Sequence, residues 1–329
     1  MSVLQRLSEM GMRRRLSPLT IECYQSWVGQ FLRFCRVDGR WRHPRELRGG
    51  DVGAFLTHLA RDRRAAAATQ NQAMCAIVFL YKQVLGEELG PDHLGQIAGE
   101  RSTRPVRVPT VLSVHEVGRI VAALAPGSVR RAMVELLYGA GLRITECCTL
   151  RLRDLDFDRQ QLIVRGGKGD KDRIVMLPAA LRGRLVEQAR HVRHQHDRDS
   201  ARGGGFAPVP NAVANKIDYA ERDWRWQYLF PSRLLRRDDA GRGYRWHADP
   251  SALDRAIRAA VRRSGVAKRV SAHTFRHSFA THLLEAGYDV RQVQTLLGHA
   301  KLETTMIYTH VMNKPATAVT SPLDRLLTV

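Results

Sequence analysis

The segment SAHTFRHSFATHLLEAGYDVRQVQTLLGHAKLETTMIYTH, residues 271–310, decides the fold of the C-terminal part of the chain. Its pattern predicts a run of short helices that begins at Ser271, with Gly287 and Gly298 at the points where helices end. The same segment carries the polar residues that indicate chemistry, so the rest of the sequence is best examined outward from it.

Four residues of this segment, His273, Arg276, His299 and Tyr308, indicate a site that acts on a phosphodiester. His273 and Arg276 lie one turn apart on one helical face, so an imidazole and a guanidinium can reach a single phosphate. Arginine suits this task because its planar fork binds two phosphate oxygens and stays charged. Tyr308 is the candidate nucleophile, which needs nearby cations and a base because a tyrosine hydroxyl has a pKa of ~10. His299 would be a second histidine donor to the phosphate or the base for Tyr308.

Breaking a phosphodiester without a metal also requires further positive charge and an acid for the departing 5′ oxygen. Arg143 follows the turn Gly139-Ala-Gly141-Leu, which can deliver a second guanidinium to the same phosphate. Lys168, in the glycine-rich stretch 165–171, is the candidate acid, and Lys171 is its competitor. This stretch lacks the full G-x-x-x-x-G-K-[ST] spacing of a P-loop, so a nucleotide site is not predicted.

The other histidines do not indicate a metal site. His273 and His277 are four residues apart, but the acid of an H-E-x-x-H site is absent and no cysteine lies nearby in the sequence. We therefore predict neither a metal nor another cofactor, and we expect His277, His282 and His310 to pack or to contact phosphate.

Charge and composition favour a nucleic-acid partner. The 53 Lys and Arg exceed the 32 Asp and Glu by 21 among 329 residues, and such a surplus repels itself unless a polyanion binds. Residues 1–98 carry 14 basic and 9 acidic residues, a net charge of +5. Residues 99–329 carry the remaining 39 basic and 23 acidic residues, a net charge of +16. Both parts are positive, as expected of a clamp around DNA, although a solvated basic surface gives the same count.

The first 98 residues predict an all-helical bundle. Ser17-Pro18 marks the start of one helix. A second helix is predicted to begin at Asp51, after Gly49-Gly50, and a third to run from Ala65 to Leu85 and to end at Gly86. Residues 99–110 hold three Arg and two Pro and predict a basic extended linker. We place the domain boundary there.

The second domain, residues 111–329, is predicted to be mainly helical with a small antiparallel sheet. Ser113-Val-His-Glu116 is a capping box that starts its first helix. Residues 161–165 and 173–177 alternate apolar and polar residues around glycine-rich turn residues, which predicts a hairpin. Residues 203–250, rich in Gly, Arg and aromatics, interrupt the helical plan and indicate an insertion.

Cysteine usage and hydropathy favour the cytoplasm. The five cysteines, an odd number without C-x-x-C spacing, are typical of thiols in a reducing compartment. The N-terminus has no apolar signal core, and no stretch approaches the ~20 apolar residues of a membrane span.

The chain resembles the tyrosine recombinases. The residues that carry the resemblance are Gly141-Leu-Arg-Ile-Thr-Glu146, Gly167-Lys-Gly-Asp-Lys171, His273-Thr-Phe-Arg-His-Ser-Phe-Ala-Thr281, Leu296-Leu-Gly-His299 and Tyr308-Thr-His310, all in the order of that family. The resemblance implies a two-domain, C-shaped DNA clamp with a helical, SAM-like core-binding domain. It also implies strand cleavage and rejoining through a 3′-phosphotyrosyl intermediate, chemistry similar to that of type IB topoisomerases.

The resemblance also assigns a role to each site residue. Tyr308 would be the nucleophile, Arg143 and Arg276 would hold the phosphate, and Lys168 would be the general acid. His273 and His299 would assist proton transfer and phosphate binding. Glu146, one turn after Arg143, would be a buried partner of the site.

Within the family, the insertion is most similar to that of integron integrases. The similar residues are Ala212–Lys216, expected to form an extra helix, Asp223-Trp-Arg-Trp-Gln-Tyr-Leu-Phe-Pro231, and the stretches 306–311 and 321–324. Members of this group recombine folded single-stranded cassette sites and a duplex integration site, and an unpaired base needs a flat side chain on which to stack. Trp224 is the first candidate for this platform, with Trp226 and Trp246 as rivals and His247 as a neighbouring contact. At least two of the three tryptophans can instead pack the insertion, and Trp246 stands where the family pattern has a histidine.

The tail, residues 311–329, carries Leu323, Leu326 and Leu327 on a free end. In the family this end docks on a neighbouring subunit and gives a tetramer on two DNA sites, which we expect here. Two alternatives stay open: a phage-type or chromosome-dimer recombinase that acts on duplex sites alone, and a non-catalytic DNA-binding protein.

Overall fold

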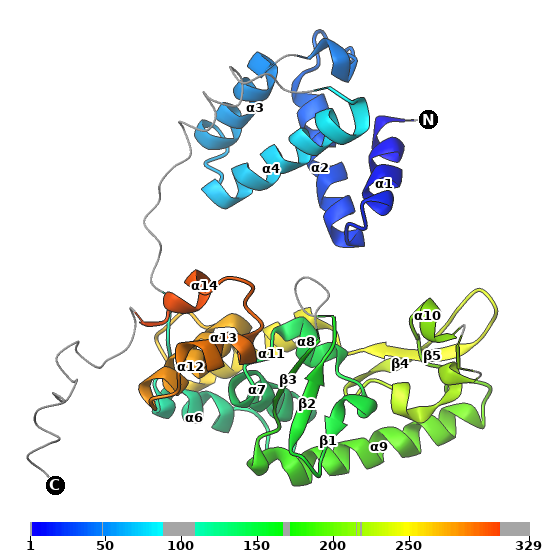
Figure 1. Cartoon of the computed structure of the whole chain (residues 1–329), viewed down its shortest axis with the longest axis vertical. Coiled ribbons are helices and arrows are strands. Elements are labelled where there is room, and N and C mark those ends of the chain that lie inside the picture. Colours follow the sequence, from blue (N-terminus) through cyan, green and yellow to red (C-terminus); the bar gives the residue numbers. More distant parts are fainter. Residues whose placement is uncertain are drawn as a thin grey trace, which may run out of the picture. The chain divides into compact units, whose positions relative to one another are not determined.

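The structure is a computed structural model that describes residues 2–47, 49–87, 109–166, 172–214, 216–217 and 219–309 (Figure 1). It divides into two compact units, Met1–Arg107 and Val108–Val329, each of which has its own core and is considered by itself. None of the helices formed by the described residues is both long enough and apolar enough to cross a membrane.

The N-terminal unit is a helical bundle, as predicted. Its elements are α1 (Val3–Arg13), α2 (Pro18–Phe34), the 3-10 turn η1 (Pro44–Glu46), α3 (Gly49–Arg61), α4 (Ala67–Phe79) and the π-helical turn η2 (Leu80–Leu85) that continues α4. Ser17 caps α2 by accepting the N–H of Thr20 at 3.1 Å, with Pro18 in the first helical position.

Two details of this unit differ from the prediction. Helix α3 begins at Gly49 rather than Asp51. Helix α1 was not predicted, although Ser2 and Gln5 form a capping box that marks its start. Leu7 of α1 is fully buried and belongs to the apolar cluster of this unit, and α1 packs against α2 and η2, so α1 is part of the core.

The C-terminal unit begins with helices α6 (Val114–Ala122), α7 (Val129–Gly139) and α8 (Ile144–Thr149). The predicted capping box at α6 is confirmed, since Ser113 and Glu116 bond each other's backbone N–H groups. After the 3-10 turn η3 (Leu152–Asp154), strands β1 (Leu155–Asp156), β2 (Gln161–Val164) and β3 (Arg173–Met176) form an antiparallel sheet in that order. The predicted hairpin is thus confirmed, with Gln161 paired to Met176 and Val164 to Arg173.

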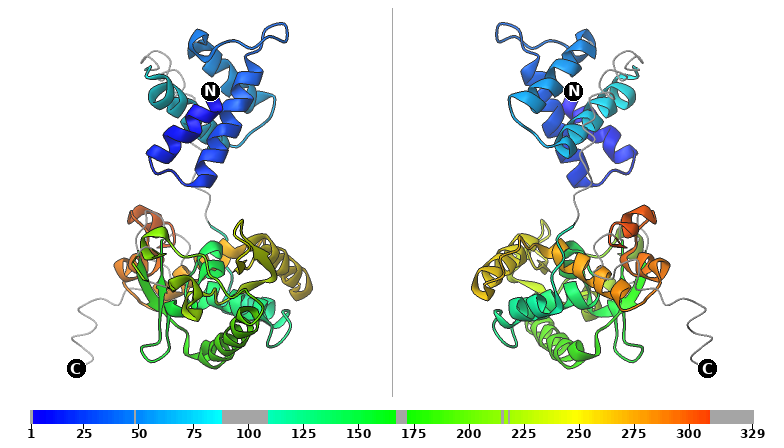
Figure 2. Two further views of the ribbon diagram at one scale, coloured as in Figure 1. Left: turned by 90° about the vertical axis from the view of Figure 1, so that its right-hand side faces the viewer. Right: turned by 90° about the vertical axis from the view of Figure 1, so that its left-hand side faces the viewer.

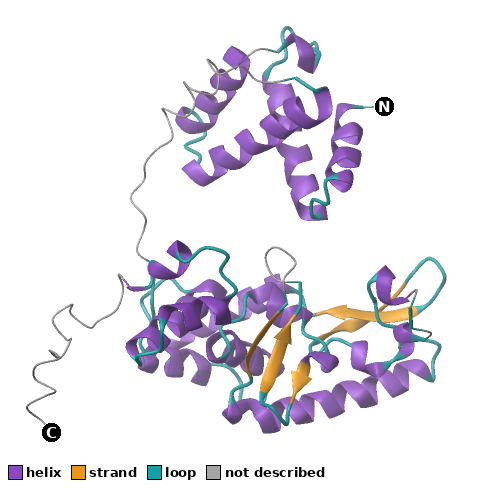
Figure 3. Ribbon diagram, in the orientation of Figure 1, coloured by secondary structure: helices purple, strands orange, loops and turns teal. Residues whose placement is uncertain are grey.

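The insertion forms a second, separate sheet, which the sequence did not predict (Figure 3). Strands β4 (Pro231–Arg237) and β5 (Gly243–His247) pair antiparallel. Between the first sheet and these strands the chain forms the turn η4 (Ala179–Leu181), the long helix α9 (Arg182–Ser200), the short helix α10 (Asn211–Ala214) and the turns η5 (Ala220–Arg222) and η6 (Trp224–Trp226). The helix expected at Ala212–Lys216 is therefore shorter, because α10 ends at Ala214 and Lys216 lies in a turn.

Helix α11 (Pro250–Ser264) follows the second sheet. Helices α12 (Ala272–Glu285), α13 (Val290–Leu297) and α14 (Glu303–Met306) confirm the run of short helices predicted from Ser271. Helix α12 contributes Phe275 to the main core of the unit and Phe279 to a smaller apolar cluster that contains Tyr308. Figure 2 shows α11, in yellow, and α14, in red, on opposite sides of this unit. Tyr308, which follows α14, lies in this smaller cluster with Phe279 of α12 and Val293 of α13.

Candidate active site

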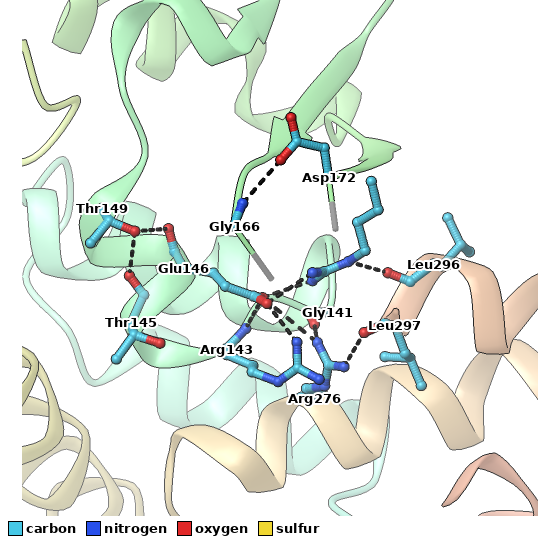
Figure 4. Close-up of polar contacts among 11 residues, drawn as sticks. Gly141, Arg143, Thr145, Glu146, Thr149, Gly166, Asp172, Arg276, Leu296 and Leu297 are labelled. Carbon is cyan, nitrogen blue, oxygen red and sulfur yellow. Dashed lines mark hydrogen bonds and ion pairs between the residues drawn. The ribbon is translucent and has the colours of Figure 1, made fainter. Parts of the chain in front are cut away.

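A buried carboxylate, that of Glu146 on α8, gathers three guanidinium groups (Figure 4). Its Oε1 accepts hydrogen bonds from Arg143 Nη1 at 2.6 Å and Arg173 Nη1 at 2.8 Å. Its Oε2 accepts from the Arg143 backbone N–H and from Arg173 Nη2, both at 2.7 Å, and lies 3.8 Å from Arg276 Nη1. Three cations around one anion leave a local surplus of positive charge, so this cluster is suited to receive a phosphate.

Burial and charge act in opposite directions on these groups. Burial by itself would raise the pKa of Glu146, but the hydrogen bonds from Arg173 and Arg143 lower it to about 2. Burial and the neighbouring Arg143 lower the pKa of Arg276 to about 10, while Glu146 opposes this shift. Glu146 and Arg276 are therefore both charged at neutral pH.

The local backbone fixes the two predicted phosphate-binding arginines. Arg143 precedes α8, and Gly141 before it has a φ of +61°, where a Cβ would stand 2.4 Å from the Phe279 ring. A glycine is required there for both reasons. Arg276 on α12 is 2% exposed and donates to the Gly141 carbonyl at 2.6 Å and to the Leu297 carbonyl. Arg276 thus ties together three segments of the chain at the cluster.

Arg173, the first residue of β3, belongs to the cluster although it was not among the predicted site residues. It binds Glu146 through both terminal nitrogens and donates from Nε to the Leu296 carbonyl at 2.9 Å. Gly298 leaves room for it, because a Cβ there would stand 2.9 Å from Arg173 Cδ and the residue has a φ of +63°. The sequence held one signal: Arg173 and the buried Val175 share a face of the strand, and an inward arginine needs a carboxylate partner.

Tyr308 lies just beyond α14 and is 2% exposed. Its hydroxyl is 3.0 Å from Nδ1 of His277, and its ring stacks on that of His299, with centroids 6.2 Å apart. Burial raises the pKa of Tyr308 although Arg276 and Arg143 oppose the shift. The predicted nucleophile is thus protonated at neutral pH and lies inside an apolar cluster.

The two predicted histidines occupy different positions. Nδ1 of His299 is 3.0 Å from Oγ1 of Thr305, and burial together with the nearby Arg276 lowers the pKa of this imidazole to about 4. His273 is exposed on α12, and its ring centroid lies 6.4 Å from that of His277. The side chain that contacts the Tyr308 hydroxyl is that of His277, for which the sequence predicted packing or phosphate contact.

Lys168 and Lys171 lie outside the described residues. The base of their hairpin is described: Arg165 binds Asp154 at 2.7 Å and Asp172 at 3.2 Å, and Asp172 accepts the N–H of Gly166 at 3.0 Å. His310 and the tail from residue 311 also lie outside the described part. Within that part, no group of three or more His, Cys, Asp or Glu is placed to hold a metal ion.

The three tryptophans of the insertion differ in exposure. Trp226 is 7% exposed and is covered by the guanidinium of Arg153, 3.9 Å from its ring centroid. Trp224 is half-buried against the main core, under Arg193. Trp246 on β5 is 38% exposed, and the centroids of Tyr228 and His247 lie 5.9 and 5.3 Å from its own. Of the three, Trp246 has the most accessible ring.

His247 supports this aromatic group. Its Nδ1 donates to the Ala248 carbonyl at 2.7 Å, and its ring meets the Tyr228 ring edge-on with centroids 5.4 Å apart. Its orientation is therefore fixed within the insertion.

Comparisons with known proteins agree with this fold. Residues 110–314 match the phage integrase family, and residues 3–91 match the phage integrase N-terminal SAM-like domain. An integrase/recombinase of Escherichia coli is 41% identical over 98% of this chain and 94% of its own length. The tyrosine recombinase XerA of Thermococcus kodakarensis is 32% identical over 90% of this chain and 86% of its own length.

A solved structure shares the fold. A lambda integrase tetramer bound to a Holliday junction aligns with a TM-score of 0.61 at 15% identity, over 97% of this chain and 78% of that one. The fold class predicted from the sequence, a mainly helical two-domain protein with a small antiparallel sheet, is confirmed. The chain belongs to the phage integrase family and is a site-specific tyrosine recombinase.

Proposed function

We propose that the chain is an integron-type recombinase that integrates and excises gene cassettes. Its substrates are folded single-stranded cassette sites and a duplex integration site. Both units of the chain have a surplus of basic residues, and we expect both to contact the DNA.

In the proposed reaction, the scissile phosphate binds beside Arg143 and Arg276, which carry the charge that develops on its nonbridging oxygens. The hydroxyl of Tyr308 attacks phosphorus and forms the 3′-phosphotyrosyl link, while Lys168 protonates the departing 5′ oxygen. His273 and His299 assist phosphate binding. Glu146 and Arg173 hold the two phosphate-binding arginines in position, so the cluster requires no rearrangement when the phosphate arrives.

The observation that carries the choice of folded DNA is the accessible ring of Trp246. It lies in an aromatic group with Tyr228 and His247, and the strands that present it are rich in arginine. A base that projects from a DNA hairpin can stack on such a ring, a contact of about 1–3 kcal/mol per base. Trp224 is half-buried and is the second candidate for stacking on a projecting base, whereas the buried Trp226 packs the insertion.

The test is incubation with each of three labelled DNAs: the bottom strand of a cassette site folded as a hairpin, the top strand, and the duplex. A denaturing gel then reports covalent complexes. We expect the bottom-strand hairpin to give a covalent adduct, and we expect Tyr308→Phe to bind the same hairpin without forming one. Adducts that persist in Tyr308→Phe would exclude Tyr308 as the nucleophile.

A second candidate is a recombinase of duplex sites alone, which the similarity to the XerA recombinase favours. A gel shift separates the two candidates. Preference for one single strand over the duplex supports the integron type, while binding to duplex alone supports the second candidate.

We also propose a tetramer on two DNA sites, in which the tail exchanges between subunits. The lambda integrase tetramer on a Holliday junction supports this assembly by similarity of fold. Removal of residues 318–329 should impair the pairing of two sites while a single site is still bound. Unchanged recombination by the shortened chain would contradict the exchange.

A further inference from the structure

The hydroxyl of Tyr308 meets a residue for which the proposed reaction has no task, His277. We propose that His277 takes the hydroxyl proton of Tyr308 when the tyrosine attacks the phosphate. This inference rests on the proposed role of Tyr308 as the nucleophile.

The geometry favours His277 over the other two histidines of the site. Nδ1 of His277 lies 3.0 Å from the Tyr308 hydroxyl oxygen, within the range of a hydrogen bond. His299 stacks on the tyrosine ring with an angle of 24° between the planes, and its Nδ1 is engaged with Thr305. His273 is exposed one turn before His277 on α12, and its ring centroid lies 6.4 Å from that of His277.

The surroundings keep His277 able to accept a proton. Burial, together with His273 and Arg276, lowers the pKa of its imidazole to about 4, so the ring is neutral at pH 7. The ionisable groups around it are His273 and Arg276 on α12, His299 after α13 and Tyr308 itself. In the proposed tautomer Nε2 carries the proton and Nδ1 accepts from the hydroxyl. A DNA phosphate bound beside Arg276 adds negative charge and strengthens His277 as a base.

The step balances as follows. The bond between Tyr308 Oη and phosphorus forms, and the hydroxyl proton passes to Nδ1 of His277. The bond between phosphorus and the 5′ oxygen breaks, and that oxygen takes its proton from the general acid, proposed to be Lys168. On rejoining, the incoming 5′ hydroxyl gives its proton back to the Lys168 amine and its oxygen bonds to phosphorus. The bond between phosphorus and Tyr308 Oη breaks, and the His277 imidazolium returns its proton to the tyrosine oxygen.

The first test is His277→Asn, which keeps a short polar side chain that can accept a hydrogen bond but cannot take a proton. We expect the rate of adduct formation to fall by about 10²- to 10⁴-fold while DNA binding and the thermal midpoint stay close to those of the unmodified chain. His282→Asn is the matched control, because His282 lies on the same helix as His277 and also contacts a tyrosine. Its Nδ1 lies 2.8 Å from the hydroxyl of Tyr138 on α7. Equal rates for His277→Asn and the control would overturn the proposal.

Two further readouts separate proton acceptance from a structural role. With DNA that carries sulfur in place of the bridging 5′ oxygen, the leaving group needs no acid, so the defect of Lys168→Ala should be relieved and that of His277→Asn should remain. Relief of the His277→Asn defect would place His277 at the leaving group instead. The adduct rate of His277→Asn should also rise with pH as hydroxide replaces the lost base, whereas a purely structural defect is independent of pH.

A measurement without DNA distinguishes this inference from the proposed function. In the ¹⁵N spectrum of the histidine rings, Nδ1 of His277 should be unprotonated, and its resonance should shift in Tyr308→Phe. An unchanged resonance would show that the contact is absent and would refute the role of His277. Absence of adducts on every DNA with the unmodified chain would instead count against the recombination proposal, and the ¹⁵N spectrum would still decide the contact.

Discussion

The two ends of the candidate site are built in different ways. The arginine end consists of Arg143, Glu146, Arg173 and Arg276. Charge-assisted hydrogen bonds join Glu146 of α8 to Arg143 and to Arg173 of β3, and an ion pair of 3.8 Å joins it to Arg276 of α12. The tyrosine end consists of His277, His299, Thr305 and Tyr308. Tyr308 follows the four-residue helix α14, and two side-chain hydrogen bonds and ring stacking hold these side chains together.

This difference indicates which part of the reaction is prepared in advance. Glu146 orients the arginines of this end through hydrogen bonds and an ion pair, and we propose that they stabilise the reacting phosphate without rearranging. The tyrosine end holds its nucleophile buried and protonated, and burial raises the pKa of Tyr308. We therefore expect the Tyr308 hydroxyl to need a proton acceptor when DNA binds, whereas the arginines only have to receive the phosphate.

The largest effect is expected from Arg276→Gln, which breaks the arginine end. Loss of this charge should lower the rate of adduct formation by about 10³-fold, because one charged donor to the reacting phosphate is removed. The matched control is Arg262→Gln, which removes an exposed arginine from α11 and so changes the net charge equally. Rates are read from the covalent adduct on denaturing gels, and similar losses in both variants would mean that overall charge explains the effect.

A second change, Glu146→Gln, tests whether the carboxylate holds the arginine end together. It leaves buried guanidinium groups without their anion and should lower the free energy of unfolding by about 3 kcal/mol at pH 7. The folded pKa of about 2 lies below the ordinary value of 4.5, so this stabilisation is complete above pH 4.5 and is lost as the pH falls toward 2. Urea unfolding between pH 7 and pH 3 measures it. If Glu146→Gln and the unmodified chain lost stability in parallel on acidification, the carboxylate would not have this role.

The smallest effect is expected from Trp246→Ala, which leaves both ends of the site intact. It should weaken binding of a hairpin with a projecting base by about 1–3 kcal/mol and leave duplex binding and stability nearly unchanged. Trp226→Ala is the contrasting variant: its ring is buried, so its removal should destabilise the fold by about 3–5 kcal/mol. Binding titrations and thermal unfolding separate the two, and equal weakening of hairpin and duplex by Trp246→Ala would contradict the stacking role.

Sequence reasoning succeeded where the signal is local. The hairpin of β2 and β3 has alternating residues around glycines, and Ser113 with Glu116 marks the start of α6. It failed for β4 and β5, because the arginines and other exposed side chains of β4 obscure the alternation that marks a half-buried strand. Helix α9 was also missed, since few apolar residues mark its inward face.

The candidate site shows the same division. Arg143 with Glu146, and His273 with Arg276, are one turn apart, so their proximity follows from helical spacing. The partners of Arg173 and His277 do not follow from spacing. Arg173 on β3 reaches a carboxylate 27 residues earlier on α8, and His277 meets Tyr308 31 residues later, after the chain has turned through α13 and α14. These contacts depend on tertiary packing, which a single sequence does not reveal.

The most direct test of the difference between the two ends is one NMR titration of the chain with an uncleavable DNA site. The chain carries ¹⁵N in its arginine side chains and ¹³C at the ring Cζ of tyrosine, and Tyr308→Phe, Arg173→Lys and Arg276→Lys assign the three resonances. We predict that the Nε resonances of Arg173 and Arg276 are ordered before DNA is added and move little afterwards, while the Tyr308 resonance shifts strongly on binding. Arginines that become ordered only with DNA, or a Tyr308 resonance that does not respond to it, would contradict the account.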